Sequence, residues 1–272
     1  MALAVCATPI GNLDDVTLRV LDELRAADLV LCEDTRVTRV LLDRHDIKAK
    51  LLSYHEHNEA KRTAELVPRL VAGERMALVT DAGLPGVSDP GARLVAAALD
   101  AGVPVTVLPG PSAVDTALVV SGLGGERFQF IGFLPRFENA LRELWAELAR
   151  WPHAVVAFES AQRLPRSLRS LAEAMPDRQV AVARELTKFY EEVARGTAAE
   201  LAERFTEPPK GEIVLVLGPA QTTATPEGED EATIVVAELV AAGLPRRRAA
   251  ELVSRLTGVS RNTLYERSVT SP

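Results

Sequence analysis

The chain has 272 residues, 47% of them hydrophobic, which is enough apolar material for one large folded domain or two moderate ones. Its net charge of −7 argues against a protein that coats nucleic acid nonspecifically, but it allows a locally basic face. No apolar run approaches the roughly 18 residues that cross a bilayer, and the N-terminus lacks the pattern of a signal peptide. The two cysteines, Cys6 and Cys32, lie in apolar segments without a CxxC partner, as expected of core thiols. We therefore expect a cytoplasmic protein with no membrane partner.

The first 120 residues alternate short β-branched runs with helical patterns. The predicted strands are 3–7, 29–32, 75–80 and 104–108, and the predicted helices are 18–27, 65–72 and 91–101. Such alternation predicts βαβ units around a mainly parallel sheet, with ligand-binding loops at the carboxyl ends of the strands.

A second alternating section follows and predicts a second α/β domain. Its strands are expected at 128–133, 154–159, 179–184 and 212–217, and its helices at 141–149, 164–174 and 197–204. The acidic segment 221–231, with Pro and Gly, is typical of a linker. We therefore predict an N-terminal α/β domain (1–120), a second α/β domain (121–220), the linker (221–231) and a helical tail (232–272).

Three loops that follow predicted strands are rich in Gly and Pro. They read ATPIGN at 7–12, TDAGLPGVSDPG at 80–91 and PGPSA at 109–113, where Ser112 is placed to cap the next helix. Neither a GxGxxG fingerprint nor a Walker A loop is among them. Because parallel strands end at one sheet edge, we expect one ligand site there. The alternative for the middle loop is a pair of tight turns that lead to a helix N-cap at Asp89.

These loops resemble those of a known family. The segments ATPIGNLDD, EDTR (33–36), DAGLPGVSDPG, PGPSA, FIGFLP (130–135) and RELTKFYEE (184–192) occur in order. Together they resemble the small-subunit rRNA cytidine-2′-O-methyltransferase branch of the tetrapyrrole methylase family, over nearly the whole chain. The resemblance implies two α/β domains with S-adenosylmethionine (SAM) in the cleft between them, and a homodimer.

The resemblance also implies which residues bind the cofactor. Carried over by motif, the SAM-binding residues are Pro9, Ile10, Asp81, Ala82, Gly83, Val87, Ser112, Ala113 and Phe158. Two departures from the family pattern are Leu84, where Thr is usual, and Ala161-Gln162, where Pro-His is usual. Leu84 removes a hydroxyl that would contact SAM, yet neither departure removes a group that methyl transfer requires.

Methyl transfer to a hydroxyl needs positioning of both partners and loss of the hydroxyl proton. The candidates for the proton acceptor are Glu185, Asp34 and Glu159, each near the carboxyl end of a strand, with Glu185 favoured. The candidate RNA contacts of the body are Arg36, His57, Arg184 and Lys188. The alternative role for this charged set is an ion-pair network between domains. Because His55 and His57 have no further ligand cluster, we expect no metal site.

The C-terminal tail is locally basic. Between 243 and 268, six arginines oppose two glutamates, and a stripe of Ala249, Leu252, Val253 and Leu256 predicts a helix. A turn at Gly258 and an N-cap at Ser260 predict a second helix, so the segment is typical of a small helix-turn-helix. The residues expected to contact RNA are Arg246, Arg247, Arg248, Arg261, Asn262 and Tyr265. The alternative is a solvated helical hairpin that packs on the body.

Two other functions fit part of the pattern. A SAM-dependent C-methyltransferase acting on a tetrapyrrole would share the SAM loops but has no use for a basic tail. A noncatalytic RNA-binding or ribosome-assembly factor would bind RNA without SAM. We favour SAM-dependent 2′-O-methylation of a cytidine ribose in small-subunit rRNA, on the assembled subunit, because an acidic protein with one basic handle needs a structured target.

Overall fold

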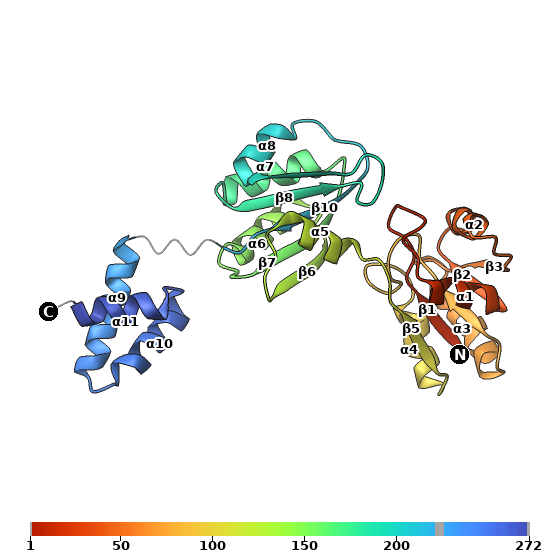
Figure 1. Ribbon diagram of the computed structural model, residues 1–272, viewed down its shortest axis with the longest axis horizontal. Helices are drawn as coiled ribbons and strands as arrows, with labels where there is room; N and C mark the ends of the chain where they lie inside the picture. The colour runs from red at the N-terminus through yellow and green to blue at the C-terminus, as the bar shows by residue number, and fades with distance from the viewer. Residues whose placement is uncertain (1, 221–225, 271–272) are drawn as a thin grey trace. The chain divides into compact units, whose positions relative to one another are not determined.

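The computed structural model describes residues 2–220 and 226–270 (Figure 1). The chain forms two compact units: the first comprises Met1–Ala146 and His153–Pro219, and the second Glu147–Pro152 and Ala220–Pro272. Of the predicted linker, residues 221–225 lie outside the described residues. No helix in the described part of the chain is long and apolar enough to cross a membrane.

The first unit contains two five-stranded sheets, and the first of them is entirely parallel. Its order is β3-β2-β4-β1-β5, with β1 (Leu3–Cys6), β2 (Leu29–Cys32), β3 (Leu51–Ser53), β4 (Met76–Leu78) and β5 (Val105–Leu108). The central strands are buried apolar runs, as expected when helices cover both faces. The predicted parallel sheet is confirmed.

Helices cover both faces of this sheet. On one face, α1 (Leu18–Ala26) and α2 (Thr35–Arg44) pack on a cluster that includes both buried thiols. On the other face, α3 (Glu59–Val71) and α4 (Ala92–Asp100) contribute leucines such as Leu66 and Leu94. The carboxyl ends of the strands stay uncovered by these helices, so the loops there are free to form a site.

The sequence analysis did not predict α2 and β3. The α2 segment carries charges on four of its ten positions and buries only Thr38, Leu41 and Leu42, so its apolar face is narrow. Strand β3 has three residues, all half-buried, which is too short for an alternating pattern. Asp34, predicted near a strand end, is the N-cap of α2.

The second sheet is mixed. Its order is β6-β7-β10-β8-β9, with β6 (Phe128–Phe133), β7 (Ala154–Ser160), β8 (Gln179–Arg184), β9 (Glu192–Thr197) and β10 (Glu212–Leu217). Only the β6–β7 pair is parallel, and β10 lies between β7 and β8 in antiparallel register. Strand β9 was not predicted, because this edge strand is polar and mostly half-exposed.

Helix α5 (Ala113–Ser121) packs on the second sheet through Val114, Ala117 and Leu118. The remaining helices of this part are α6 (Glu138–Leu148), α7 (Leu164–Ala174) and α8 (Ala198–Arg204). Because α5 begins at Ala113, before residue 120, yet packs on the second sheet, the chain crosses from one sheet to the other directly after β5. The domain boundary at residue 120 stays a prediction.

The second unit holds three helices in its described part, α9 (Pro226–Ala241), α10 (Arg246–Thr257) and α11 (Arg261–Thr270). Their small core includes Val236, Val253 and Leu264. Helix α9 begins at Pro226, inside the predicted linker, because Pro is tolerated in the first turn of a helix. Leu256 was predicted in the apolar stripe of α10, and this is wrong: it is 86% exposed, whereas Ala249 and Val253 are buried.

Candidate functional site

The loops after β1 and β4 are joined by hydrogen bonds. The Thr8 amide donates to the Gly83 carbonyl at 2.8 Å, and the Gly83 amide donates to the Thr8 carbonyl at 3.1 Å. The Thr8 hydroxyl also donates to the carbonyl of Thr80, at 2.9 Å. Gly83 has a φ of 83°, which favours glycine. The two loops therefore form one continuous backbone surface.

The loop after β5 reaches the same surface. A Cβ atom on Gly110 would lie 2.9 Å from the Cβ of Ala7, so glycine permits this close approach. The Ser112 hydroxyl accepts a hydrogen bond from the Asp115 amide at 3.3 Å, which confirms Ser112 as the N-cap of α5. All three predicted loops thus meet at one edge of the parallel sheet.

These loops and the second sheet enclose a cavity of about 840 Å³, the larger of two described here. One wall consists of β6, β7 and β10 residues, among which Phe158 contacts Phe130 and Phe133 edge to face, with ring centroids 4.9 and 5.4 Å apart. The opposite wall is formed by the loop residues of the first sheet. The cavity therefore offers an aromatic wall facing exposed backbone groups.

Most of the predicted cofactor residues line this cavity. The residues that line the larger cavity are Ile10, Ala82, Gly83, Val87, Ser112, Ala113 and Phe158. Pro9 and Asp81 line the smaller cavity instead. Leu84 and Ala161, the two departures from the family pattern, also line the larger cavity, so both affect its shape.

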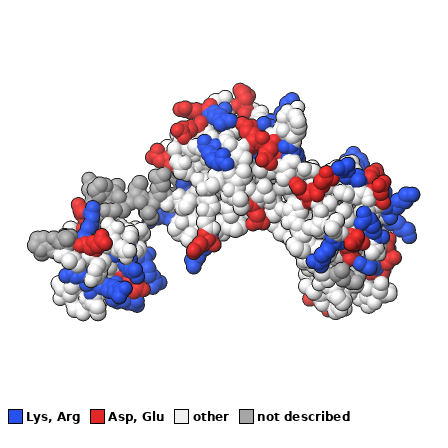
Figure 2. Space-filling model, in the orientation of Figure 1, with Lys and Arg blue, Asp and Glu red and all other residues white. Residues whose placement is uncertain are grey.

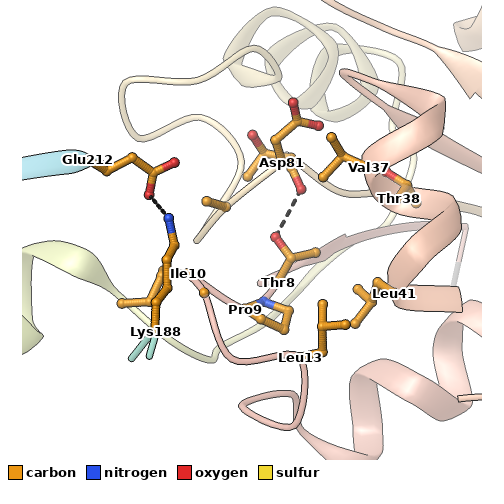
Figure 3. A pocket seen from close by; sticks show the side chains of 13 residues that line it. Thr8, Pro9, Ile10, Leu13, Val37, Thr38, Leu41, Asp81, Lys188 and Glu212 are labelled. Atoms are coloured by element: carbon orange, nitrogen blue, oxygen red, sulfur yellow. Dashed lines mark hydrogen bonds and ion pairs between the residues drawn. The ribbon is translucent and has the colours of Figure 1, made fainter. Parts of the chain in front are cut away.

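The smaller cavity measures about 160 Å³ (Figure 3). It shares Ile10, Ala82 and Glu212 with the larger one. Figure 3 shows the ion pair of Lys188 and Glu212 on one side and side chains of α2 on the other. The two cavities are therefore neighbours that share part of one wall.

Glu185, the favoured proton acceptor, is held by other groups. It forms an ion pair with Lys188 at 3.0 Å and accepts the Glu212 amide at 3.0 Å. The backbone hydrogen bond from Glu212, followed by the Lys188 contact, lowers the pKa of Glu185. Its φ of 52° fixes it in a strained turn. This carboxylate is a weak base and an anchor for its loop.

The other two predicted acceptors are also occupied. The Arg36 guanidinium, 2.6 Å from Asp34, lowers the pKa of that carboxyl to about 2. Glu159 lines the larger cavity, yet its side chain is buried and accepts hydrogen bonds from the Ser167 hydroxyl and the Ser160 amide, beside the Arg163 guanidinium at 2.5 Å. Each carboxylate already has the partners that a charged group needs.

Asp89 is a cavity residue that the sequence analysis did not select. Burial, followed by the charge of Glu33, raises the pKa of Asp89 to about 6. Burial also raises the pKa values of Glu33 and Asp81. The alternative in which Asp89 caps a helix is wrong, because Gly91 is the N-cap of α4. The signal for Asp89 was its place in the same loop as Asp81.

The remaining charged candidates of the body form ion pairs within it, except His57. Arg184 pairs with Glu192 at 2.8 Å, and Lys188 bridges Glu185 and Glu212. His57 is exposed and stacks edge to face with His55, the ring centroids being 5.9 Å apart. Within residues 2–220 and 226–270, no group of three or more His, Cys, Asp or Glu side chains is arranged to hold a metal ion.

One turn of the second domain touches the first. The Thr187 hydroxyl accepts the Asn12 amide at 3.0 Å, which ties the loop of β1 to the loop after β8. A Cβ atom on Gly11 would lie 2.5 Å from Lys188 Cγ and 2.8 Å from the Leu186 carbonyl oxygen. Close packing at this turn therefore holds the loop of Ile10, which lines both cavities.

Basic side chains gather on the helical unit (Figure 2). Arg247, Arg248 and Arg261 are exposed, as are Asn262 and Tyr265, and Arg246 is half-buried. Arg248 pairs with Glu251 at 2.9 Å. Among the described residues, Arg246, Arg247, Arg255 and Arg261 have no carboxylate within ion-pair distance. These guanidinium groups are available to an anionic partner.

Comparisons with known proteins match both units. The model of Tetrapyrrole (Corrin/Porphyrin) Methylases matches residues 2–202, and that of the RsmI C-terminal HTH domain matches residues 226–270. A Mesorhizobium japonicum protein named ribosomal RNA small subunit methyltransferase I is 45% identical over 98% of this chain and 90% of its own length. A Thermotoga maritima protein of the same name is 46% identical over 79% of this chain and 97% of its own.

A solved structure matches the fold of the first unit. Uroporphyrin-III C-methyl transferase from Thermus thermophilus, complexed with S-adenyl homocysteine, superposes with a TM-score of 0.56 at 21% identity. The match covers 79% of this chain and 96% of that one. At this identity, the similarity establishes the shared architecture of the two-sheet unit.

Proposed function

The chain belongs to the tetrapyrrole (corrin/porphyrin) methylase family, and on that premise we propose that it methylates small-subunit ribosomal RNA. The donor is SAM, and the acceptor is the ribose 2′-hydroxyl of a cytidine in the assembled subunit. The relatives that are 45% and 46% identical carry a name that states methylation of small-subunit ribosomal RNA. The observation that carries the proposal is the larger cavity, whose walls come from both sheets.

The residues of the larger cavity fit SAM. Its volume of about 840 Å³ is within the range of cofactor sites, roughly 300–1,000 Å³. The Phe158 wall suits a purine ring, and the loops of Gly83 and Ser112 offer backbone groups for the polar parts. When bound, SAM supplies the electrophilic methyl group.

Asp89 is the proton acceptor in this proposal. The reaction breaks the hydroxyl O–H bond and forms an O–CH₃ bond, so a group beside the cavity must take the proton. Asp89 lines the cavity, and its pKa of about 6 leaves it ionised but basic at neutral pH. Glu185, Asp34 and Glu159 are anchored by the ion pairs described above and serve the framework.

In this proposal, the helical unit binds the RNA. Arg246, Arg247 and Arg261 can neutralise phosphates, and the exposed Tyr265 can stack on a base. The match of residues 226–270 to an HTH domain model supports this role. Arg36, His57, Arg184 and Lys188 remain candidates for RNA contact on the body. A homodimer and a cytoplasmic location stay predictions.

The experiment is a labelling assay. The purified protein and methyl-labelled SAM are incubated with small ribosomal subunits from cells that lack the enzyme, and the rRNA is digested to nucleosides. The expected label is in 2′-O-methylcytidine. Equal labelling of protein-free rRNA would contradict the choice of the assembled subunit.

The same assay separates the two alternative functions. No label in RNA despite bound SAM would favour a methyltransferase for a small molecule such as a tetrapyrrole. RNA binding without SAM binding would favour a noncatalytic factor. The basic helical unit argues against the first alternative, and the cavity of SAM-compatible size argues against the second.

A further inference from the structure

The smaller cavity has the size of one six-membered ring. It measures about 160 Å³, and a cavity of roughly 150 Å³ holds one benzene molecule in other proteins. Pro9, Leu13, Val37 and Leu41 give it apolar walls. A SAM molecule, with its purine, ribose and methionine parts, is too large for this space. The cavity therefore suits a separate, small and planar group.

The position of this cavity links it to the reaction. Its wall residues Ile10, Ala82 and Glu212 also line the larger cavity. A ring in the smaller cavity would place the atoms attached to it at this shared wall. In a nucleotide, the group attached to the base is the ribose, which carries the hydroxyl to be methylated.

One wall of the smaller cavity carries a free hydrogen-bond acceptor. Asp81 Oδ1 accepts the Asp34 amide at 3.1 Å, which fixes the orientation of the carboxylate. Asp81 Oδ2 has no hydrogen-bond partner among residues 2–220 and 226–270. The half-buried carboxylate therefore has one oxygen available to a donor on a ligand.

We propose that the smaller cavity binds the base of the target nucleotide, and that Asp81 selects a pyrimidine with an exocyclic amino group. The inference rests on the proposed function. Enzymes that do chemistry on a base take it out of the stack and hold it in a fitted pocket, and we extend this arrangement to a reaction on the ribose attached to the base. A purine exceeds the space of a single ring, and this defines the size part of the selection.

The Asp81 carboxylate provides the second part of the selection, between cytosine and uracil. Carboxylates accept hydrogen bonds from the N4 amino group of cytosine. Uracil has a carbonyl oxygen at the same position, and this oxygen would face the Asp81 carboxylate without a proton between them. A site built to bond an amino group rejects the analogue that lacks it, because the buried acceptor is left unpaired. The cavity therefore favours cytidine over uridine.

An isosteric variant of Asp81 tests this selection directly. In Asp81→Asn, the amide oxygen can still accept the Asp34 amide, because that acceptor position is fixed by a backbone group. The amide NH₂ then replaces Oδ2 in the cavity, so an acceptor becomes a donor. This donor matches the uracil carbonyl and opposes the cytosine amino group.

The test compares small subunits that carry cytidine or uridine at the target position. For the wild type, we expect kcat/KM roughly 10- to 100-fold higher on the cytidine subunits. For Asp81→Asn, we expect the ratio to fall to about 1 or to reverse, with SAM affinity by calorimetry within about threefold of the wild type. Asp43→Asn, which alters an exposed carboxylate of α2, should retain the wild-type ratio and affinity.

The outcomes separate the two proposals. Equal methylation of both subunits by the wild type would overturn the base pocket and leave the proposed function standing. No methylation of either, with SAM bound, would overturn the proposed function and the pocket together. An Asp81→Asn variant that loses SAM affinity but keeps the cytidine preference would place Asp81 in the cofactor site and overturn its role in base selection.

Discussion

Charged side chains near the two sheets of the first unit differ in whether they have charged partners. Around the second sheet, Glu159, Glu185 and Lys188 all have charged partners at 2.5–3.0 Å. At the edge of the parallel sheet, Asp81 and Asp89 lie in or beside a cavity and have raised pKa values. Satisfied charges stabilise a framework, and unsatisfied ones are available for chemistry. Glu159, Glu185 and Lys188 therefore belong to the framework, and Asp81 and Asp89 are the reactive groups.

The largest effect is expected at Asp89. Asp89→Asn removes the proton acceptor but keeps the shape, so kcat should fall about 10²- to 10⁴-fold while SAM affinity is retained. In the wild type, activity should decrease as the pH falls below about 6, because the carboxylate then binds a proton. The measurement is the labelling rate on small subunits between pH 5 and 8.

Glu185→Gln is the control for this experiment. Its ion pair with Lys188 is partly exposed, so its loss should change kcat by less than about tenfold. If Glu185→Gln abolishes activity and Asp89→Asn does not, the division between reactive and framework carboxylates is wrong.

At Glu159, the comparison predicts an effect on stability. Glu159→Ala removes a buried carboxylate and leaves the Ser167 hydroxyl and the Arg163 guanidinium without it, which should cost about 3 kcal/mol of the free energy of unfolding. Urea denaturation provides the measurement. Glu138→Ala, which breaks more exposed pairs with Arg142 and Arg166, should cost clearly less. Equal losses in the two variants would contradict the assignment.

The contact between the two sheets' loops can be tested at Gly11. In Gly11→Ala, the new methyl group would meet Lys188 Cγ and the Leu186 carbonyl oxygen, so the turn must shift, at a cost of about 1–3 kcal/mol. Because Ile10 lines both cavities, SAM affinity should also decrease. Gly125→Ala, where no atom lies within 4 Å of the new methyl group, is the matched control and should bind SAM as the wild type does.

The sequence predicted the fold well where apolar patterns are strong. Strands β2 and β10 have the predicted bounds, because burial on both faces produces continuous apolar runs. It missed α2, β3 and β9, in which half-buried or charged positions interrupt the pattern. Leu256 was placed in the apolar stripe of α10 but is exposed, because helix periodicity alone does not tell which neighbour is present.

The site was predicted in its location more than in its chemistry. Gly and Pro in three loops indicated where the backbone meets a ligand, and those loops do line the cavities. The sequence analysis considered Glu185, Asp34 and Glu159 but not Asp89, because what distinguishes these carboxylates is their pairing, and pairing is a property of tertiary structure. The Glu212 amide and Lys188 lower the pKa of Glu185, whereas burial and the charge of Glu33 raise the pKa of Asp89. No spacing in the sequence reports either environment.

The smallest expected effect is on the free energy of unfolding, which the half-buried Asp89 carboxylate lowers. Because the folded-state pKa of Asp89 is raised from 3.8 to about 6, the native state binds more protons than the unfolded state between these values. Stability should therefore fall as the pH rises from 4 to 6, and Asp89→Asn should regain it. The shift of about two pKa units corresponds to roughly 3 kcal/mol, reduced to about 1 kcal/mol because solvent screens a half-exposed group. The variant should melt about 2–4 °C higher than the wild type at pH 8 and at the same temperature at pH 4. An equal gain at both pH values would mean that better packing, and not the removal of an unpaired charge, stabilises the variant.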